Sequence, residues 1–417
     1  MARKRWFRLL VLYFTIFFGM GFLFVLAIGV HSFLILPKAP TNWNAKQIEQ
    51  IKANQKKLKD PEHFAFAVLG DNRGSIRTFN RIIAEMNKPQ QVEDSANPDK
   101  YTSQNLLFAI DMGDLVFNGY NVQFRRFINQ VQGLKMPILT AVGNHDLDPG
   151  THEVATSKTD PRFGSLNNSK NYQKIFGPTY YSFTVGNSYF IVMDISTEYM
   201  ANTAAEKKYF DDELKWVQSE LAKSQSYKHR FVFSHVPPFK GKKVLKGTQK
   251  DNPDTFLRNP GYSEQIKEMC VKYNVEYLFG CHLHTFDLDF WPKGPQDSDG
   301  SVTMVITGAA GAELWKTADI RNMNQFTLIS IQDLNPVDIE TGSPGPTFDP
   351  VPVKVGGQSI TYMYVEEPWV MTYTFVSDQF ALLMPVMSVL FLGFLGLSIL
   401  SWRGMKKGKA EQGRAGE

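Results

Sequence analysis

Polar side chains of the kinds that bind metal ions follow directly after short apolar stretches of this sequence. Five such stretches read as buried strands that run into loops, at residues 64–69, 106–110, 137–142, 230–233 and 275–279. The polar residues that follow them are Asp71, Asp114, Asn144, His145, His235, His282 and His284. Carboxylate, amide and imidazole groups are ligands that suit Mn, Fe, Zn, Ni or Co. The sequence therefore predicts a metal site and leaves the identity of the metal open.

Each of these signals is weak when it is taken singly. A Gly-Asp pair after a strand is more often a turn, and a lone histidine is more often a satisfied polar residue than a ligand. In order along the chain, however, the strand ends present four of the eight histidines. Two ions about 3.5–4 Å apart, bridged by a carboxylate, can generate a hydroxide nucleophile and clamp a phosphoryl group. The combined pattern indicates hydrolysis of a phosphate ester.

Helices are expected between the strands that carry these residues. The periodicity predicts helices at residues 76–86, 121–132, 206–224 and 263–273. Alternating strands and helices predict an α/β fold with a partly parallel sheet, which binds ligands beyond the carboxyl ends of its strands. Further strands are predicted at 180–195 and 301–307, and a second sheet is closed by 326–331 and 361–375. Residues 342–357 read as a loop, and 45–58 as a basic helix that serves as a solvated spacer.

Two long apolar runs lie near the ends of the chain. Residues 9–36 and 380–402 contain no Asp, Glu, Lys or Arg, and each is long enough as a helix to cross a hydrocarbon core of about 30 Å. Basic residues flank both runs on the terminal side, so we expect both termini in the cytoplasm and the intervening chain across the membrane. The alternatives are a cleaved signal peptide for the first run and a buried core helix for the second.

The charge of the chain is concentrated in its two tails. Residues 1–8 and 403–417 together hold nine basic and two acidic side chains. Their net charge of +7 exceeds the +4 of the whole chain and leaves about −3 for everything between them. That balance argues against nucleic acid as a bulk partner. The only two cysteines, Cys270 and Cys281, fall on a predicted helix and after a predicted strand, so we expect no disulfide.

The motifs together resemble the calcineurin-like metallophosphoesterase superfamily, and within it the purple acid phosphatase-like branch. The matching segments are Gly70-Asp-Asn-Arg-Gly74, Gly113-Asp114, Gly143-Asn-His-Asp146, His235 and Gly280-Cys-His-Leu-His284, with His235-Val-Pro-Pro-Phe239 and Thr307-Gly-Ala-Ala-Gly311 in support. The resemblance covers roughly residues 64–331. It implies an α/β fold, a four-layer α-β-β-α sandwich of two mixed β-sheets flanked by helices, to which this chain adds two transmembrane helices.

The resemblance also implies a role for each metal-binding residue. Asp71 and His284 would bind the first ion, and Asp114 would bridge both ions. The remaining ligands of the second ion would be Asn144, His235 and His282. The implied cofactor is therefore a pair of divalent or trivalent metal ions.

The catalytic side chains follow from the same resemblance. His145 would face the substrate and protonate the leaving oxygen or stabilise charge on the phosphoryl group, with Asp146 orienting its ring. Many members of the superfamily carry Asp-x-His where this chain has Arg73, which cannot bind a metal. The first ion would then be weakly held or completed by water, and Arg73 would grip the phosphate. Phe117 stands where Gly-Asp-x-x-Asp would have a carboxylate, which predicts a lost supporting contact.

These features predict the following organisation. The segments are a cytoplasmic tail at 1–8, a transmembrane helix at 9–36, a juxtamembrane linker at 37–62, a metallophosphoesterase domain at 63–375, a transmembrane helix at 380–402 and a cytoplasmic tail at 403–417. Five lysines follow His235 at positions 240, 242, 243, 246 and 250. We interpret them as a solvated loop, with attraction of a polyanionic substrate or of anionic lipid as the functional alternative.

Three functions are compatible with these features. The first is hydrolysis of a phosphomonoester or phosphodiester outside the cytoplasm, on a periplasmic, extracellular or lumenal face, and the anchors make a lipid-linked substrate a candidate. The second is a catalytically degenerate binding or scaffold protein, which Arg73 and Phe117 favour and the retained ligands of the second ion disfavour. The third is a transporter component, which the uncharged spans disfavour. We expect the first function, and we assign no oligomeric state.

Overall fold

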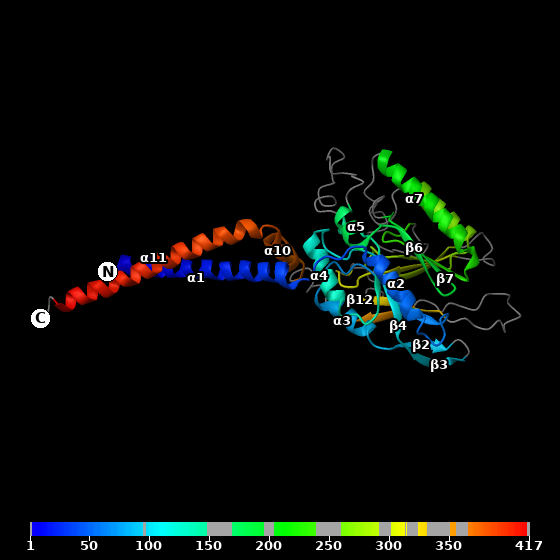
Figure 1. Cartoon of the computed structure of the whole chain (residues 1–417), viewed down its shortest axis with the longest axis horizontal. Coiled ribbons are helices and arrows are strands. Elements are labelled where there is room, and N and C mark those ends of the chain that lie inside the picture. The colour runs from blue at the N-terminus through cyan, green and yellow to red at the C-terminus, as the bar shows by residue number, and fades with distance from the viewer. Residues whose placement is uncertain are drawn as a thin grey trace. The chain divides into compact units, whose positions relative to one another are not determined.

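The computed structural model describes residues 2–94, 97–147, 169–195, 204–238, 260–291, 302–312, 314, 324–331, 351–355 and 366–414 (Figure 1). It divides into two compact units. One unit consists of Met1–Pro37 together with Trp369–Glu417, and the other is Lys38–Pro368. The lysine-rich loop at 240–250 lies outside the described residues.

The terminal unit is built from helices. It contains α1 (Ala2–Val30), the short π-helix η1 (His31–Ile35), most of α10 (Glu367–Asp378) and α11 (Phe380–Arg414). Phenylalanines stack between α1 and α11, with ring centroids 5.2 Å apart for Phe18 and Phe394. Two segments, Arg5–Ile35 and Phe380–Trp402, are long and apolar enough to cross a membrane. The predicted apolar helices are therefore present.

The larger unit contains a five-stranded mixed sheet. Its strand order is β13 (Val351–Val355), β12 (Asn324–Ile331), β1 (Phe64–Leu69), β4 (Leu106–Asp111) and β5 (Ile138–Thr140). The last three run parallel, whereas β12 pairs antiparallel with both β1 and β13. The segments after β1, β4 and β5 therefore emerge at the same end of this sheet. A separate hairpin joins β2 (Gln90–Asp94) to β3 (Asn97–Gln104).

The second sheet has six strands and is also mixed. Its order is β10 (Phe286–Trp291), β11 (Val302–Thr307), β9 (Tyr277–Gly280), β8 (His229–Phe233), β7 (Ser188–Val192) and β6 (Tyr181–Val185). Strands β11, β9, β8 and β7 run parallel to one another, and the two edge strands pair antiparallel. The strands β8 and β9 therefore deliver their following loops at one end of the second sheet.

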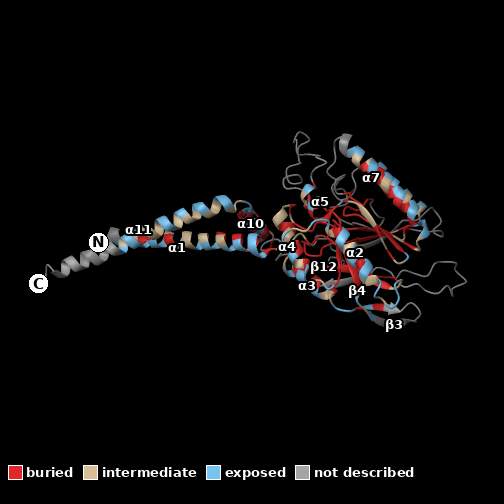
Figure 2. Ribbon diagram, in the orientation of Figure 1, coloured by how far each residue is buried: buried red, intermediate tan, exposed pale blue. Residues whose placement is uncertain are grey.

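An aromatic core joins the two sheets face to face. Phe66 and Phe108 of the first sheet meet Phe190 of the second at ring centroid distances of 5.5 and 5.6 Å. All three rings are fully buried. The strands of the two sheets are coloured as buried along most of their described length (Figure 2). Such contacts combine a large buried apolar area with favourable edge-to-face geometry. This core fixes the spacing of the two sheets and hence of their loops.

Helices cover the two outer faces. The first sheet packs against α3 (Arg77–Met86), α4 (Asn121–Val131) and α5 (Lys170–Phe176), and the second against α7 (Ala204–Lys223) and α8 (Pro260–Lys272). Two short 3-10 turns, η2 (Asn144–Asp146) and η3 (Ser224–Ser226), and the helix α2 (Trp43–Gln55) complete the described part of this unit. The predicted four-layer α-β-β-α sandwich is confirmed, and the predicted helices begin and end within a few residues of the observed ones.

Three strand predictions differ from the structure. Residues 326–331 lie in the sheet that contains β1, and not in the sheet formed by the later strands. The predicted loop at 342–357 contains β13. The predicted strand at 361–375 is helical from Glu367 onward, and its first residues lie outside the described ones. The β-branched and aromatic residues of this stretch suggested a strand, but Pro368 near its start is typical of a helix N-terminus.

The segment predicted as a solvated spacer is instead part of the larger unit. Helix α2 lies along the outer edge of β5, where Trp43 Nε1 donates to the Ile138 carbonyl at 2.8 Å. Asn44 pairs with both backbone groups of Thr140, each at 3.0 Å, and Ile51 is fully buried. These bonds satisfy backbone groups that an uncovered edge strand would leave open. The spacer prediction failed because the basic residues of α2 concealed a buried face.

Candidate metal centre

Loops from both sheets bring the predicted ligands together. Two groups of buried side chains have potential ligand atoms that all lie within 4.8 Å of one another. The first group is Asp71, Asp114 and His284, and the second is Asp114, His235 and His282. The two groups share Asp114. A carboxylate that belongs to both groups is what a bridge between two ions would need.

Individual distances connect the strand ends within this cluster. His235 Nε2 lies 3.2 Å from Asp114 Oδ1 and 3.0 Å from Asn144 Oδ1. His284 Nε2 lies 3.7 Å from Asp71 Oδ1, and Asp71 Oδ2 accepts the His282 amide at 2.9 Å. The predicted metal-binding residues therefore form one continuous cluster between the carboxyl ends of the two sheets.

The backbone at the cluster adopts an uncommon conformation. Five of the eight non-glycine residues with positive φ in the described part of the chain are here: Asp71, Arg73, Asp114, His282 and His284, with φ between 45° and 65°. Each such residue costs roughly 1–3 kcal/mol unless the surroundings hold it in place. Hydrogen bonds between loops do so, because the Arg73 amide donates to the Asp114 carbonyl at 2.8 Å. Strain of this kind is typical of ligand-binding loops.

Glycines allow these loops to approach closely. Gly113 has a φ of 105°, and a Cβ atom there would lie 2.5 Å from the Gly143 amide nitrogen. A Cβ on Gly143 would in turn lie 2.1 Å from the Asp114 amide nitrogen. The glycines of the two motifs therefore set the distance between Asp114 and the loop that carries Asn144.

Burial and mutual repulsion shift the protonation of the cluster. Burial, followed by the charge of Asp114, raises the pKa of Asp71 well above its ordinary value. For Asp114 burial acts in the same direction, but the neighbouring His235, His145 and Arg73 outweigh it and hold its pKa below the ordinary value. Burial lowers the pKa of His235 to about 4, so the ring is neutral near pH 7 and can offer a lone pair.

The donor set of this cluster fits metal ions. Asp71 Oδ1 is buried and accepts no hydrogen bond, although a buried carboxylate oxygen normally has a partner. Crowded carboxylates surrounded by imidazoles are the chemistry of Mn, Fe, Zn, Ni or Co sites, and a cation would relieve their repulsion. The His235 Nδ1 atom lies 3.1 Å from the Met112 carbonyl, which fixes the tautomer with Nε2 directed at the cluster.

His145 lies beside the cluster and is partly exposed. Its amide donates to Asp114 Oδ1 at 2.9 Å, and its Nδ1 lies 2.8 Å from the Phe117 carbonyl. The expectation that Asp146 orients this ring is wrong, because the turn of η2 folds the Asp146 carboxylate back onto the Gly143 amide, 2.9 Å away. The backbone of Phe117 supplies the orienting acceptor instead, and the Phe117 ring packs 5.6 Å from the imidazole.

Arg73 contacts the shared carboxylate. Its Nε lies 3.3 Å from Asp114 Oδ2, and its side chain is 12% exposed. The guanidinium therefore places a permanent positive charge next to the cluster, at the position where the resemblance led us to expect a histidine in many members of the superfamily. This charge contributes to the low pKa of Asp114.

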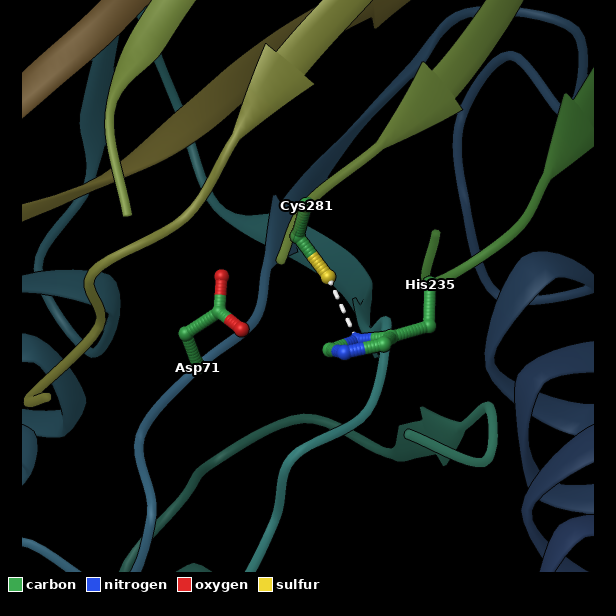
Figure 3. A group of neighbouring side chains, drawn as sticks. All are labelled: Asp71, His235 and Cys281. Atoms are coloured by element: carbon green, nitrogen blue, oxygen red, sulfur yellow. Dashed lines mark hydrogen bonds between the residues drawn. The ribbon is translucent and has the colours of Figure 1, made fainter. Parts of the chain in front are cut away.

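Sequence reasoning missed three residues at this site. Asn72 donates from Nδ2 to Asp111 Oδ2 at 2.9 Å, and burial raises the pKa of Asp111 to about 8. The thiol of Cys281 lies 3.0 Å from His235 Nδ1, and together with Asp71 these residues form a third group of potential ligands (Figure 3). The available signals were that Asn72 is next to Asp71, that Cys281 is next to His282, and that Asp111 directly follows the predicted strand at 106–110. Both cysteines are free thiols, as predicted.

The fold and the cluster together define a class of metallophosphoesterase-like proteins. The sequence profile of the calcineurin-like phosphoesterases matches residues 64–286, which is more than half of the chain. The chain therefore belongs to the calcineurin-like phosphoesterase family.

Several known proteins are similar to this chain. Serine/threonine-protein phosphatase CPPED1 of Rattus norvegicus is 24% identical over 181 residues, which are 43% of this chain and 49% of the relative. The Bos taurus protein of the same name is 25% identical over 179 residues. The chain thus spans about half the length of the curated relatives it matches. Among solved structures, purple acid phosphatase PPD1 from yellow lupin has a TM-score of 0.45 and 18% identity, covering 65% of this chain and 50% of the lupin chain.

Proposed function

We propose that this protein is a metal-dependent phosphoesterase with a dinuclear centre. The observation that carries the proposal is that two groups of potential ligands share the carboxylate of Asp114. Membership of the calcineurin-like phosphoesterase family supports the reaction class. The proposed substrate is a phosphate ester, and the name of the CPPED1 relatives adds phosphoserine and phosphothreonine to the candidates.

Each residue of the cluster has a proposed task. Asp71 and His284 would hold the first ion, Asp114 would be shared by both ions, and the second ion would be held by three further side chains: Asn144, His235 and His282. When bound, the two ions lower the pKa of a water molecule and neutralise charge on the phosphoryl group. Arg73 adds a fixed positive charge that stabilises the equatorial oxygens.

His145 is the proposed general acid. The Phe117 carbonyl can only accept, so Nδ1 of His145 carries a hydrogen and Nε2 is the atom that gains or loses a proton. A charged His145 would donate the Nε2 proton to the leaving oxygen, and the carboxylate of Asp114 nearby stabilises that charged form.

The proposed location is an extracytoplasmic membrane face. Two apolar helices near the termini are long enough to span a bilayer. The basic residues on their terminal sides favour both termini in the cytoplasm and residues 63–375 on the other side. Tethering at both ends brings a lipid-linked phosphate ester within reach of the centre, so this substrate class is part of the proposal.

The test is hydrolysis by the purified, detergent-solubilised full chain. p-Nitrophenyl phosphate, bis-p-nitrophenyl phosphate and a phosphoserine peptide are compared after metal removal and after addition of Mn²⁺. We expect Mn²⁺-dependent turnover that Asp114→Ala abolishes and His145→Ala lowers by about 10²–10⁴-fold. The preferred ester distinguishes monoesterase from diesterase activity. A folded chain without turnover with Mn²⁺, Fe, Zn, Ni or Co would refute the proposal.

One observation favours a second candidate, a scaffold that keeps the fold without turnover. Arg73 Nε lies 3.3 Å from Asp114 Oδ2, on the carboxylate that would bridge the ions. Metal content separates the two functions. A scaffold would purify with less than one equivalent of metal and would not bind phosphate competitively with its ligand, whereas the enzyme would hold two ions and be inhibited by phosphate.

A further inference from the structure

Helix α3 begins directly after the loop that carries Asp71 and Arg73, and its own sequence provides no cap. The residue at the N-cap position is Ile76, whose side chain cannot accept a hydrogen bond, and the first turn contains no acidic residue. The first four amides of a helix lack acceptors within the helix, and its N-terminus carries a partial positive charge. An acceptor from elsewhere in the fold is therefore needed.

Glu366 supplies that acceptor from nearly 300 residues further along the chain. Its Oε2 accepts the Ser75 hydroxyl and the Ile76 amide, both at 2.8 Å, and its Oε1 accepts the Arg77 amide at 3.2 Å. The side chain is buried, with 5% of Glu366 exposed. Hydrogen bonds to a carboxylate are roughly twice as strong as neutral ones. Both carboxylate oxygens of Glu366 are thus committed to the start of α3.

A short chain of contacts connects Glu366 to the proposed metal ligands. Ser75, which donates to Glu366, also donates its amide to the Asn72 carbonyl at 2.8 Å. Asn72 lies between Asp71 and Arg73, and its Nδ2 donates to the carboxylate of Asp111 at the end of β4 at 2.9 Å. A displacement of Ser75 would therefore be transmitted directly to Asn72, the residue between Asp71, a proposed ligand of the first ion, and Arg73.

The surroundings leave Ser75 little room to compensate. A Cβ atom on Gly311 would lie 2.5 Å from the Ser75 Cβ and 2.9 Å from the Asn72 carbonyl oxygen. Gln130 Nε2 additionally donates to the Ser75 carbonyl at 2.9 Å. The segment from Asp71 to Ser75, which we call the metal loop, is therefore held from three sides, and Glu366 is the charged member of that set.

We propose that Glu366 is a positioning residue for the metal loop, acting through Ser75 and the start of α3 to set the geometry of Asp71 and Arg73. The inference rests on the proposed dinuclear function. Glu366 immediately precedes α10, which α11 follows along the chain, so the part of the chain that leads to the C-terminal apolar helix also completes the metal centre. A fragment that ends before residue 366 lacks this contact even though every proposed metal ligand is present.

The experiment measures Mn²⁺ binding to the metal-stripped full chain in detergent, by equilibrium titration with detection of free Mn²⁺. The variants are Glu366→Gln, which keeps the shape and removes the charge, and Glu366→Asp, which keeps the charge on a shorter side chain. Glu85→Gln is the matched control, because Glu85 lies on the same helix and its carboxylate bonds to Lys88 at the surface. Thermal unfolding of the metal-free forms is recorded in parallel.

We expect Glu366→Gln to lower the affinity for one of the two Mn²⁺ ions by about 10–100-fold. The affinity for the other ion should stay within about threefold of that of the unchanged chain. Glu366→Asp should recover part of the loss, and Glu85→Gln should change neither ion. Equal affinities in Glu366→Gln and the unchanged chain would overturn the proposal. So would an equal weakening of both ions, since that result indicates general destabilisation. If Glu366→Gln does not fold, Glu366→Asp is judged by the same criteria.

The unchanged chain separates this inference from the proposed function. If it binds fewer than two Mn²⁺ ions and hydrolyses none of the esters, the dinuclear function itself fails. If it binds two ions and hydrolyses an ester while Glu366→Gln binds Mn²⁺ equally well, only the positioning role fails.

Discussion

At the scale of single residues, the site differs from the expectation most clearly around His145. A buried aspartate next to a histidine in sequence suggested the usual carboxylate–imidazole pair. The backbone instead directs Asp146 at the Gly143 amide and leaves the Phe117 carbonyl to orient the ring. Phe117 stands where a carboxylate was expected to give a supporting contact. It orients the His145 ring through its main-chain carbonyl instead, which any residue at that position could do.

The proposed role of His145 makes a prediction about leaving groups. A general acid matters most when the leaving oxygen is strongly basic, because that oxygen needs a proton as its bond breaks. We expect His145→Ala to lower kcat/KM for phenyl phosphate by at least about tenfold more than for p-nitrophenyl phosphate. Phe117→Leu keeps the carbonyl and should show no such difference. Equal losses on both esters in His145→Ala would rule out proton donation by this residue.

Glu213 gives a second prediction at this scale, and it concerns stability. The side chain is fully buried, Oε1 accepts the Asp194 amide at 2.6 Å, and Oε2 accepts no hydrogen bond. Burial, followed by the charge of Asp194, raises the pKa of Glu213 well above its ordinary value. The folded protein thus binds this proton more tightly than the unfolded chain does. The resulting contribution of Glu213 to the free energy of unfolding is present below the unfolded pKa and is lost as the pH rises through the folded pKa.

Replacing Glu213 by glutamine should remove that pH dependence. We expect Glu213→Gln to gain stability relative to the unchanged chain as the pH is raised from about 4 to 8, by about 1.4 kcal/mol for each unit of pKa difference. The measurement is urea unfolding of the detergent-solubilised chain across this range. Glu268→Gln, at an exposed position of α8, is the control and should follow the unchanged chain. If the free energies of unfolding of Glu213→Gln and of the unchanged chain differed by the same amount at every pH, the prediction would be contradicted.

At the scale of elements, local sequence patterns predicted the secondary structure well where a strand or helix is buried on a regular face. The strands 64–69 and 106–110 were identified because they are continuous apolar runs, and both are fully buried. The assignment of strands to sheets could not be read from those runs. Strand β12 joins β1 across more than 250 residues, and such a pairing leaves no local signal.

The same limit applied to the candidate site. Asp71, Asp114 and His284 were predictable because each follows a strand at the end where ligands gather. Glu366 was not, because it comes from a segment without a motif and acts on a helix start nearly 300 residues earlier. Contacts of that separation depend on the packed structure, so sequence patterns alone do not contain them.

Helix α2 provides a prediction at the element scale. Asn44 is 3% exposed and satisfies both the amide and the carbonyl of Thr140 on the edge strand β5. Asn44→Ala would leave these backbone groups partly unsatisfied, so we expect a loss of about 1–3 kcal/mol in the free energy of unfolding. Urea unfolding measures it, with Gln50→Ala on the exposed face of α2 as the control. If Asn44→Ala were as stable as this control, α2 would be a spacer after all.

At the scale of the whole molecule, the two units have different surfaces. The described part of Lys38–Pro368 buries its apolar side chains in three clusters around the two sheets. The exposed large apolar side chains of the described residues lie in the terminal unit, along α1, η1, α10 and α11. Exposed apolar surface of this kind is typical of helices that lie in a bilayer, and it therefore supports the proposed location. The proposed orientation across a bilayer can be tested by labelling introduced cysteines, because the native thiols are buried.

The native cysteines make such a test clean, because Cys270 and Cys281 are 1% and 0% exposed. Lys215→Cys introduces a thiol on α7 at a side chain that is 76% exposed, and Gly413→Cys introduces one in the C-terminal tail. In sealed cells that carry the chain on their surface membrane, a membrane-impermeant maleimide should label Lys215→Cys at once and Gly413→Cys only after permeabilisation. The basic residues at 403–414 favour this orientation, since such flanks stay in the cytoplasm. Labelling of Gly413→Cys in sealed cells, with Lys215→Cys protected, would place the metal centre in the cytoplasm and remove the extracytoplasmic substrates from the proposal.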